Sequence, residues 1–299
     1  MTPLLTVCII TYNHEKYIRE AIEGVLMQNV NFFFEIIIAD DCSTDNTRAI
    51  LLEYKEKYPE LFNFIFQEKN IGAAQNWFQL INAPKSKYIA YFEGDDYWTD
   101  PLKLQKQVDF LEDNLSYVAT YHRYAYKYPN KYSVQCLNNE FNLDTYYKDT
   151  ITIIDLLKTS KIRTLTVVFR NILIENPLPN YLLDLKFGDW PLFLHLSRFG
   201  NFKLLDIIGV YRINTPNSVA NSIRKDLAPH IIFFYNYLLN DINYRFYKKI
   251  ILTYVIGITI QILKKSIKQY NISNTIRYLI KLIKYSFLLW IVKKSAPLN

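Results

Sequence analysis

The residues best suited to chemistry are three acids that follow a short apolar run. Residues 88–92 are apolar, and Glu93, Asp95 and Asp96 come directly after them. Such a run predicts a buried strand, and carboxylates at the carboxyl end of a parallel strand face the binding crevice of an α/β sheet. Adjacent carboxylates repel one another, and a divalent cation such as Mg²⁺ or Mn²⁺ bridging to a diphosphate would offset this repulsion. The alternative is a simple turn before a helix that starts at Pro101.

Further apolar runs predict the sheet that must position these acids. The runs at 4–10 and 34–39 each precede polar residues, and the second precedes another acidic pair, Asp40 and Asp41. Helical spacing of apolar residues alternates with these runs. The predicted strands are 4–10, 34–39, 62–66, 88–92 and 117–121, and the predicted helices after the first lie at about 45–58, 73–82 and 101–114. This alternation predicts an α/β fold with a doubly wound, mostly parallel sheet and flanking helices.

Regular patterns weaken after residue 128 and then return. Residues 128–149 are polar and rich in Tyr and Asn. A regular secondary-structure pattern returns at 151–158, and the patterns at 164–169 and 203–211 are typical of strands. We interpret residues 1–224 as one domain, and residues 225–299 as an appended helical tail. Cys8, Cys42 and Cys136 are odd in number and lack metal-ligand spacing, which favours reduced thiols and a cytoplasmic setting. No signal-peptide pattern opens the sequence.

The net charge of +7 is distributed unevenly. From residue 242 onward there are eleven Lys and Arg and no acid, so removing these eleven charges leaves −4 for residues 1–241. A mildly acidic main domain argues against nucleic acid as a partner, and the basicity belongs to the tail.

The tail contains a basic amphipathic pattern. Arg277, Lys281 and Lys284 recur at helical spacing, with apolar residues on the remaining faces. This pattern favours a helix lying in the plane of an anionic membrane surface. The apolar stretch at 250–263 is predicted to be too short to span a bilayer, which needs about 20 residues. The alternative for the tail is a helical hairpin packed on the main domain with a solvated basic face.

Five short motifs occur in a defined order along the chain. They are Thr11-Tyr12-Asn13, Asp40-Asp41-Cys42-Ser43-Thr44-Asp45, Asn70-Ile71-Gly72, Glu93-Gly94-Asp95-Asp96 and Gly188-Asp189. The ordered set resembles glycosyltransferase family 2, the inverting sugar transferases of the GT-A fold, over about residues 5–215. The resemblance implies transfer of a sugar from a nucleotide-diphosphate donor to an acceptor hydroxyl, with a metal-dependent leaving group and a carboxylate base. Residues 1–121 would then form the nucleotide-binding half and 122–224 the acceptor-facing half.

The resemblance also assigns residues to the nucleotide. Asp41 would accept a hydrogen bond from the ring N–H of uracil or thymine, so a UDP- or dTDP-sugar is the expected donor. Tyr12 would stack on the base. The remaining candidates for nucleotide binding are Thr11, Asn13, Asn70, Gly72, Asp95 and Arg212. The alternatives are helix capping for Asp41, an ordinary turn for Asn70 and Gly72, and a surface cation for Arg212.

Metal binding and catalysis are assigned to the later motifs. Asp96 is the expected metal ligand, and Asp95 is expected to contact the ribose or the metal. Asp189 matches the carboxylate that removes the proton of the acceptor hydroxyl. The family frequently has a Glu-Asp pair here, and because this chain has Gly188, Asp189 is the only acid of its motif. The alternative role for Asp189 is a helix N-cap.

Together these assignments predict an enzyme of cell-surface polysaccharide or glycolipid assembly. The expected acceptor is a saccharide or a lipid-linked saccharide, and the expected location is the cytoplasmic face of the cell membrane, held peripherally by the tail. Two other functions stay open, namely a nucleotidyltransferase acting on a sugar phosphate and a non-catalytic nucleotide-binding scaffold. The joint presence of Asp41, Asp96 and Asp189 argues against the scaffold.

Overall fold

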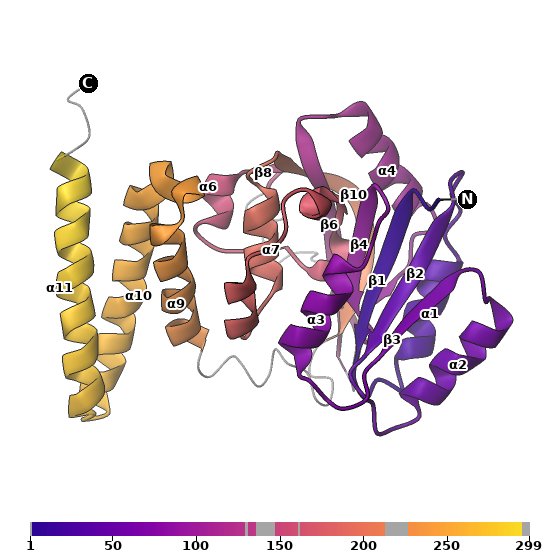
Figure 1. Cartoon of the computed structure of the whole chain (residues 1–299), viewed down its shortest axis with the longest axis horizontal. Coiled ribbons are helices and arrows are strands. Elements are labelled where there is room, and N and C mark those ends of the chain that lie inside the picture. The colour runs from indigo at the N-terminus through magenta and orange to yellow at the C-terminus, as the bar shows by residue number, and fades with distance from the viewer. Residues whose placement is uncertain (1, 129–130, 136–146, 161, 213–226, 295–299) are drawn as a thin grey trace. The chain divides into compact units, whose positions relative to one another are not determined.

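The computed structural model describes residues 2–128, 131–135, 147–160, 162–212 and 227–294. The chain divides into two compact units, the first covering 1–156 and 160–222 and the second covering 157–159 and 223–299 (Figure 1). The domain boundary expected at residue 224 lies outside the described residues, and so does much of the polar stretch at 128–149.

A mixed sheet forms the centre of the first unit. Its strand order is β3-β2-β1-β4-β9-β6-β10-β5, with β7 beside β6 and β8 beside β10. The strands are β1 (Leu5–Thr11), β2 (Phe34–Asp40), β3 (Phe62–Phe66), β4 (Tyr88–Glu93), β5 (Tyr97–Trp98), β6 (Tyr117–Tyr128), β7 (Lys131–Gln135), β8 (Thr150–Ile151), β9 (Val168–Arg170) and β10 (Asn201–Arg212). The pairs among β3, β2, β1 and β4 are parallel, as predicted, and β6 is parallel to β10. β9 is antiparallel to both β4 and β6, between which it lies.

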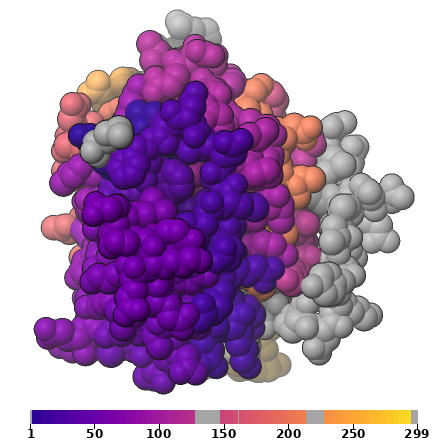
Figure 2. Space-filling model, turned by 90° about the vertical axis from the view of Figure 1, so that its right-hand side faces the viewer, coloured from indigo at the N-terminus to yellow at the C-terminus, as the bar shows by residue number. Residues whose placement is uncertain are grey.

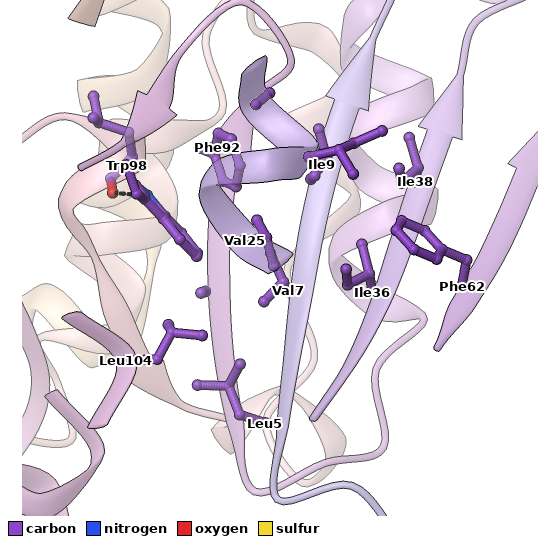
Figure 3. Close-up of a cluster of buried hydrophobic side chains, with 14 of the residues drawn as sticks. Leu5, Val7, Ile9, Val25, Ile36, Ile38, Phe62, Phe92, Trp98 and Leu104 are labelled. Carbon is purple, nitrogen blue, oxygen red and sulfur yellow. Dashed lines mark hydrogen bonds between the residues drawn. The ribbon is translucent and has the colours of Figure 1, made fainter. Parts of the chain in front are cut away.

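Helices cover both faces of this sheet, which explains why its strands read as continuous apolar runs. The helices of the first unit are α1 (Ile18–Leu26), α2 (Thr47–Lys57), α3 (Ala73–Asn82), α4 (Lys103–Asp113), α6 (Ile153–Leu156) and α7 (Asp189–Leu196). Alternate residues of β1 and β2, such as Val7 and Ile36, pack with α1, α2 and α4 in one core cluster (Figure 3). On the opposite face, Asn76 of α3 donates to the Ala39 carbonyl at 3.1 Å. The N-terminal βα units supply most of the surface in Figure 2.

The short strand after the acidic motif was not predicted from the sequence patterns. β5 follows Asp96 directly and pairs with β10. Its Trp98 is buried, and the indole N–H donates to the Leu165 carbonyl at 2.8 Å (Figure 3). The strand predicted over 164–169 is instead a 3-10 turn, η1 (Thr164–Thr166), followed by β9. Two short 3-10 turns, η2 (Ile172–Ile174) and η3 (Asn180–Asp184), then lead to α7.

The second unit is helical. Its elements are α9 (Leu227–Asn240), η4 (Ile242–Tyr247), α10 (Lys248–Lys268) and α11 (Ile272–Lys294). The prediction that the apolar stretch is too short to span a bilayer is wrong, because the helical stretch Ile242–Lys268 is long and apolar enough to cross one by length and composition. A core helix has the same properties, and α10 packs on both α9 and α11.

The cysteines that the structure describes are both thiols. Cys8 is buried in β1 and Cys42 is half-buried after β2, and neither forms a disulfide. Cys136 lies outside the described residues. Burial raises the pKa of the Cys8 thiol, which makes it an inert member of the core.

Candidate active site

The carboxyl ends of β1, β2 and β4 meet at one edge of the sheet. In the strand register Thr11 lies opposite Asp40, and Ile10 lies opposite Glu93. The chain proceeds from β1 outward to β2 and β3 and then returns to β4 on the other side of β1. This reversal is the topological switch point at which α/β sheets open a crevice for ligands. The register therefore brings the first, second and fourth predicted motifs to that crevice.

The loops after β1 and β2 are tied to each other. The backbone N–H of Asn13 donates to Ser43 Oγ at 2.9 Å, and the Thr44 N–H donates to Asn13 Oδ1 at 2.8 Å. Asn13 has a φ of 55°, a left-handed conformation that Asn tolerates better than most residues. Buried Asp40 accepts hydrogen bonds from Ser43 and forms an ion pair with Arg48 at 2.7 Å. Asn13 and Asp40 thus fix the loop that carries Tyr12, which is half-buried.

Asp41 holds the third motif in place. Its two carboxylate oxygens accept from the backbone N–H groups of Ile71 at 2.8 Å and Gly72 at 3.0 Å. Gly72 has a φ of 88° immediately before α3, a conformation that L side chains rarely adopt. Burial raises the pKa of the Asp41 carboxyl, and the two backbone hydrogen bonds oppose that rise. The structure therefore joins Asp41 to the turn containing Asn70. Asp41 does not cap α2, whose first residue, Thr47, donates its backbone N–H to Asp45.

The acids after β4 lie in a desolvated environment. Glu93 accepts a hydrogen bond from the Thr164 hydroxyl, and burial raises the pKa of Glu93 to about 7. Asp96 is buried, and one of its oxygens accepts the Arg212 backbone N–H at 2.9 Å. Burial, together with the charges of Asp95 and Glu93, raises the pKa of Asp96 well above its usual range. The charges of Asp95 and Glu93 thus add to the cost of ionising Asp96.

Arg212 is packed into the wall of the crevice. Its guanidinium binds the Glu20 carboxylate and the Asp95 carbonyl, and it lies 4.7 Å from the ring centroid of Tyr97 and 5.0 Å from that of Tyr17. Arg212 is 8% exposed, so it is not an ordinary surface cation. Residues 213–226, which follow Arg212, lie outside the described residues.

Asp189 is the first residue of α7. The residue at the N-cap position is Gly188, which has no side chain to cap the helix. Burial raises the pKa of the Asp189 carboxyl, and the positive charge of Arg163 opposes that rise. The negative charge of Asp189 in turn contributes to the raised pKa of Glu93, so the two carboxylates lie within electrostatic reach. The structure thus brings the fifth motif to the acidic cluster at the end of β4.

The sequence patterns did not single out several side chains of this site. Thr164 is the first residue of η1, and its hydroxyl donates to Glu93. Arg163 directly precedes η1, and its charge opposes the rise in the pKa of Asp189. His14 has a buried Nδ1 without a hydrogen-bond partner, and that atom lies 3.1 Å from the position of a Cβ at Gly94. Only the pairing of β4 with β9 could have indicated that the segment near residue 164 approaches the acids, and no local pattern encodes that pairing.

The residues present suit a divalent cation that a ligand helps to coordinate. Within the described ranges, no group of three or more His, Cys, Asp or Glu side chains could hold a metal ion by itself. However, the second oxygen of Asp96, Oδ2, is buried without a hydrogen-bond partner. Carboxylate oxygens are the ligands that Mg²⁺ and Mn²⁺ prefer, and Mg²⁺ commonly takes only one or two of them together with phosphate oxygens.

Comparison with known proteins agrees with this geometry. The glycosyl transferase family 2 model matches residues 6–176. An uncharacterized protein of Mycobacterium tuberculosis is 35% identical over 209 residues, which cover 70% of this chain and 58% of the relative. A Bacillus subtilis protein whose name proposes a teichuronic acid biosynthesis glycosyltransferase, TuaG, is 38% identical over 109 residues, 36% of this chain and 42% of the relative. The match thus spans little more than half of the mycobacterial relative.

Solved structures share the fold. Staphylococcus aureus TarS residues 1–349 with UDP-GlcNAc has a TM-score of 0.68 at 18% identity, covering 95% of this chain and 81% of that one. The mannosyltransferase PcManGT of Pyrobaculum calidifontis, with GDP-Man and Mn²⁺, has a TM-score of 0.57 at 15% identity, covering 97% and 84%. On the family match, with a central sheet flanked by helices as in these structures, the chain belongs to glycosyl transferase family 2 and has the GT-A fold.

Proposed function

We propose that this protein transfers a sugar from a UDP- or dTDP-sugar to an acceptor hydroxyl, with inversion at the anomeric carbon. The observation that carries the proposal is the meeting of Asp41, the acids after β4, and Asp189 at one switch point of the sheet. Family membership and the UDP-sugar bound in the TarS structure support the same reaction class.

The nucleotide would occupy the Asp41 side of the crevice. The Asp41 carboxylate is already oriented by two backbone N–H groups, so it needs little rearrangement to accept a ring N–H from a uracil or thymine. Tyr12 at the end of β1 would stack on the base, with Thr11 and Asn13 beside it. The turn at Asn70 and Gly72 would approach the donor closely, because Gly72 presents no side chain there.

Asp96 would hold a Mg²⁺ or Mn²⁺ through its buried, unpartnered Oδ2, and Asp95 would contact the same ion or the ribose. Such an ion supplies charge stabilisation to a departing diphosphate when it is bound. Arg212 orients Asp96 through its backbone N–H and would contribute positive charge near the phosphates.

Asp189 would remove the proton of the acceptor hydroxyl as that oxygen attacks the anomeric carbon. The raised pKa of this carboxyl makes it a stronger base than an exposed aspartate. The nearby acids have other hydrogen-bond partners. The Thr164 hydroxyl donates to Glu93, and the backbone N–H of Arg212 at the end of β10 donates to Asp96.

A ligand screen followed by product analysis tests this proposal. Thermal unfolding would be followed with UDP, dTDP, ADP and GDP, each with and without Mn²⁺. We expect UDP or dTDP with Mn²⁺ to raise the unfolding temperature most, because a ligand that binds only the folded state stabilises it. Product analysis must then show release of a nucleoside diphosphate and a new glycoside. Release of pyrophosphate from a nucleoside triphosphate would indicate a nucleotidyltransferase, and binding without turnover would indicate a scaffold.

The tail suggests where the reaction takes place. α11 exposes an apolar stripe at helical spacing, and cationic residues lie beside it. The exposed apolar residues are Ile272, Ile276, Leu279, Ile280, Ile283, Phe287, Trp290 and Ile291. An exposed stripe of this kind favours an anionic membrane surface. We propose that the enzyme works at the cytoplasmic face of the membrane, on a saccharide or lipid-linked acceptor for a cell-surface polysaccharide or glycolipid.

A further inference from the structure

Arg163 is held at the crevice by aromatic rings. Its guanidinium carbon lies 4.8 Å from the ring centroid of Tyr211 and 5.8 Å from that of Tyr124. Tyr124 is buried and itself packs edge to face against Tyr211 at 5.8 Å. Rings in this arrangement fix the direction of the guanidinium plane and stabilise its charge.

Buried charges are usually paired with an opposite charge, and Arg163 has tyrosine rings in that place. Within the described part of the chain, Arg163 forms no salt bridge with a carboxylate, and its buried Nε has no hydrogen-bond acceptor. Removing a guanidinium from water and leaving a donor unsatisfied both cost free energy. In contrast, the other arginine of the crevice, Arg212, is paired with Glu20. The position therefore suits an anion that arrives with a ligand.

The two arginines serve different sides of the crevice. Arg212 binds Asp96 through its backbone N–H and the Asp95 carbonyl through its guanidinium. Arg163 directly precedes Thr164, whose hydroxyl donates to Glu93, and its charge opposes the rise in the pKa of Asp189. Arg163 thus lies on the side of the base, and Arg212 on the side of the acids that would face the donor diphosphate. An anion next to Arg163 would accordingly belong to the acceptor.

Resting on the proposed transfer reaction, we propose that Arg163 and its supporting tyrosines form an anion subsite for the acceptor. The acceptor is then a saccharide that carries a phosphate or a carboxylate near the hydroxyl that attacks. A planar guanidinium binds either group through two parallel hydrogen bonds. Such a subsite would orient the acceptor hydroxyl toward Asp189.

Binding of three small saccharides to the full chain with bound UDP tests the proposal. The probes are glucose 6-phosphate, glucuronate and methyl glucoside, so that phosphate, carboxylate and neutral acceptors are compared. We expect at least one anionic probe to bind about tenfold more tightly than methyl glucoside, because a hydrogen bond to a charged group typically contributes this much. The probe that binds more tightly identifies the anion.

Variants test whether Arg163 causes the preference for an anionic probe. Arg163→Gln should remove the preference for the anionic probe and leave binding of methyl glucoside and UDP unchanged, and Arg163→Lys should retain part of it. Arg123→Gln is the matched control, because Arg123 of β6 pairs with exposed Asp206 of β10.

Three results would overturn the subsite. They are equal binding of all three probes by the wild-type chain, equal losses for the neutral and anionic probes in Arg163→Gln, and a loss of UDP affinity in that variant, which would place Arg163 at the donor. The first result needs no variant, so it holds even if Arg163→Gln does not fold. Failure of the wild-type chain to bind UDP would instead count against the proposed function.

Discussion

The indole of Trp77 lies directly against the backbone of Gly188. A Cβ added at Gly188 would stand 2.8 Å from Cε3 of the indole and 2.9 Å from its Cδ2. Trp77 is 5% exposed on α3, and Gly188 precedes Asp189 at the start of α7. The ring therefore occupies the space that a side chain at residue 188 would need.

Gly188→Ala should therefore destabilise the first unit. Overpacking against a buried ring typically costs about 1–3 kcal/mol in the free energy of unfolding. The same substitution at Gly257 in α10 is the control, since a Cβ there meets nothing within 4 Å and Ala is favoured in a helix by up to about 1 kcal/mol. Urea denaturation of both variants should give effects of opposite sign. A Gly188→Ala protein as stable as the wild type would show that Trp77 moves aside freely.

Asp96→Asn should weaken metal binding and leave the fold intact. The amide oxygen can still accept the Arg212 N–H, so the end of β10 should keep its anchor. The negative charge and the unpartnered oxygen are lost, so the gain in UDP affinity on adding Mn²⁺ should largely disappear in calorimetry. Asp206→Asn, at an exposed position, should bind UDP with the wild-type metal dependence. An unchanged metal dependence in Asp96→Asn would exclude Asp96 as a ligand.

Local patterns were sufficient to predict the elements that position the site. Apolar runs located β1, β2, β3 and β4, and parallel pairing then placed Asp41 and Asp96 at one edge of the sheet. Patterns could not reveal contacts that depend on distant chain segments. Arg212 meets Glu20 across 192 residues of sequence, and Arg163 lies in irregular backbone that has no periodicity to interpret.

The buried Lys103 should make stability depend on pH. Its Nζ donates to Gln107 at 2.6 Å and lies 4.0 Å from the ring centroid of Trp98, and burial lowers its pKa well below the usual range. Between the lowered folded-state pKa and the unfolded-state pKa, the unfolded chain binds a proton that the folded chain does not. The free energy of unfolding should therefore rise with pH in this range, up to about 10.4. Lys103→Met should remove this contribution to the slope.

Equilibrium unfolding in urea at about pH 7 and about pH 9 would measure that slope. Lys55→Met on the exposed surface of α2 is the control and should keep the wild-type slope. Equal slopes in the wild type and Lys103→Met would show that the amine keeps its proton in the folded protein.

The apolar stripe of α11 should determine membrane binding. Ile280→Asp with Ile283→Asp, at positions 62% and 63% exposed, should abolish sedimentation of the full chain with phosphatidylglycerol vesicles. Lys281→Gln with Lys284→Gln should weaken binding most at low salt, where attraction to anionic lipid is least screened. Lys55→Gln with Lys57→Gln changes the net charge equally and should have no effect. Wild-type sedimentation by the Ile280 and Ile283 variant would contradict a membrane role for this stripe.

The most direct test of the proposed chemistry compares donor binding with sugar transfer in Asp189→Asn. A base acts only on the acceptor, so UDP affinity by calorimetry should stay at the wild-type value while product formation falls by about 10²–10⁴-fold. Because burial raises the pKa of Asp189, wild-type transfer should also increase with pH as this carboxyl loses its proton. Near-normal transfer by Asp189→Asn, with donor affinity intact, would contradict the assignment of Asp189 as the base.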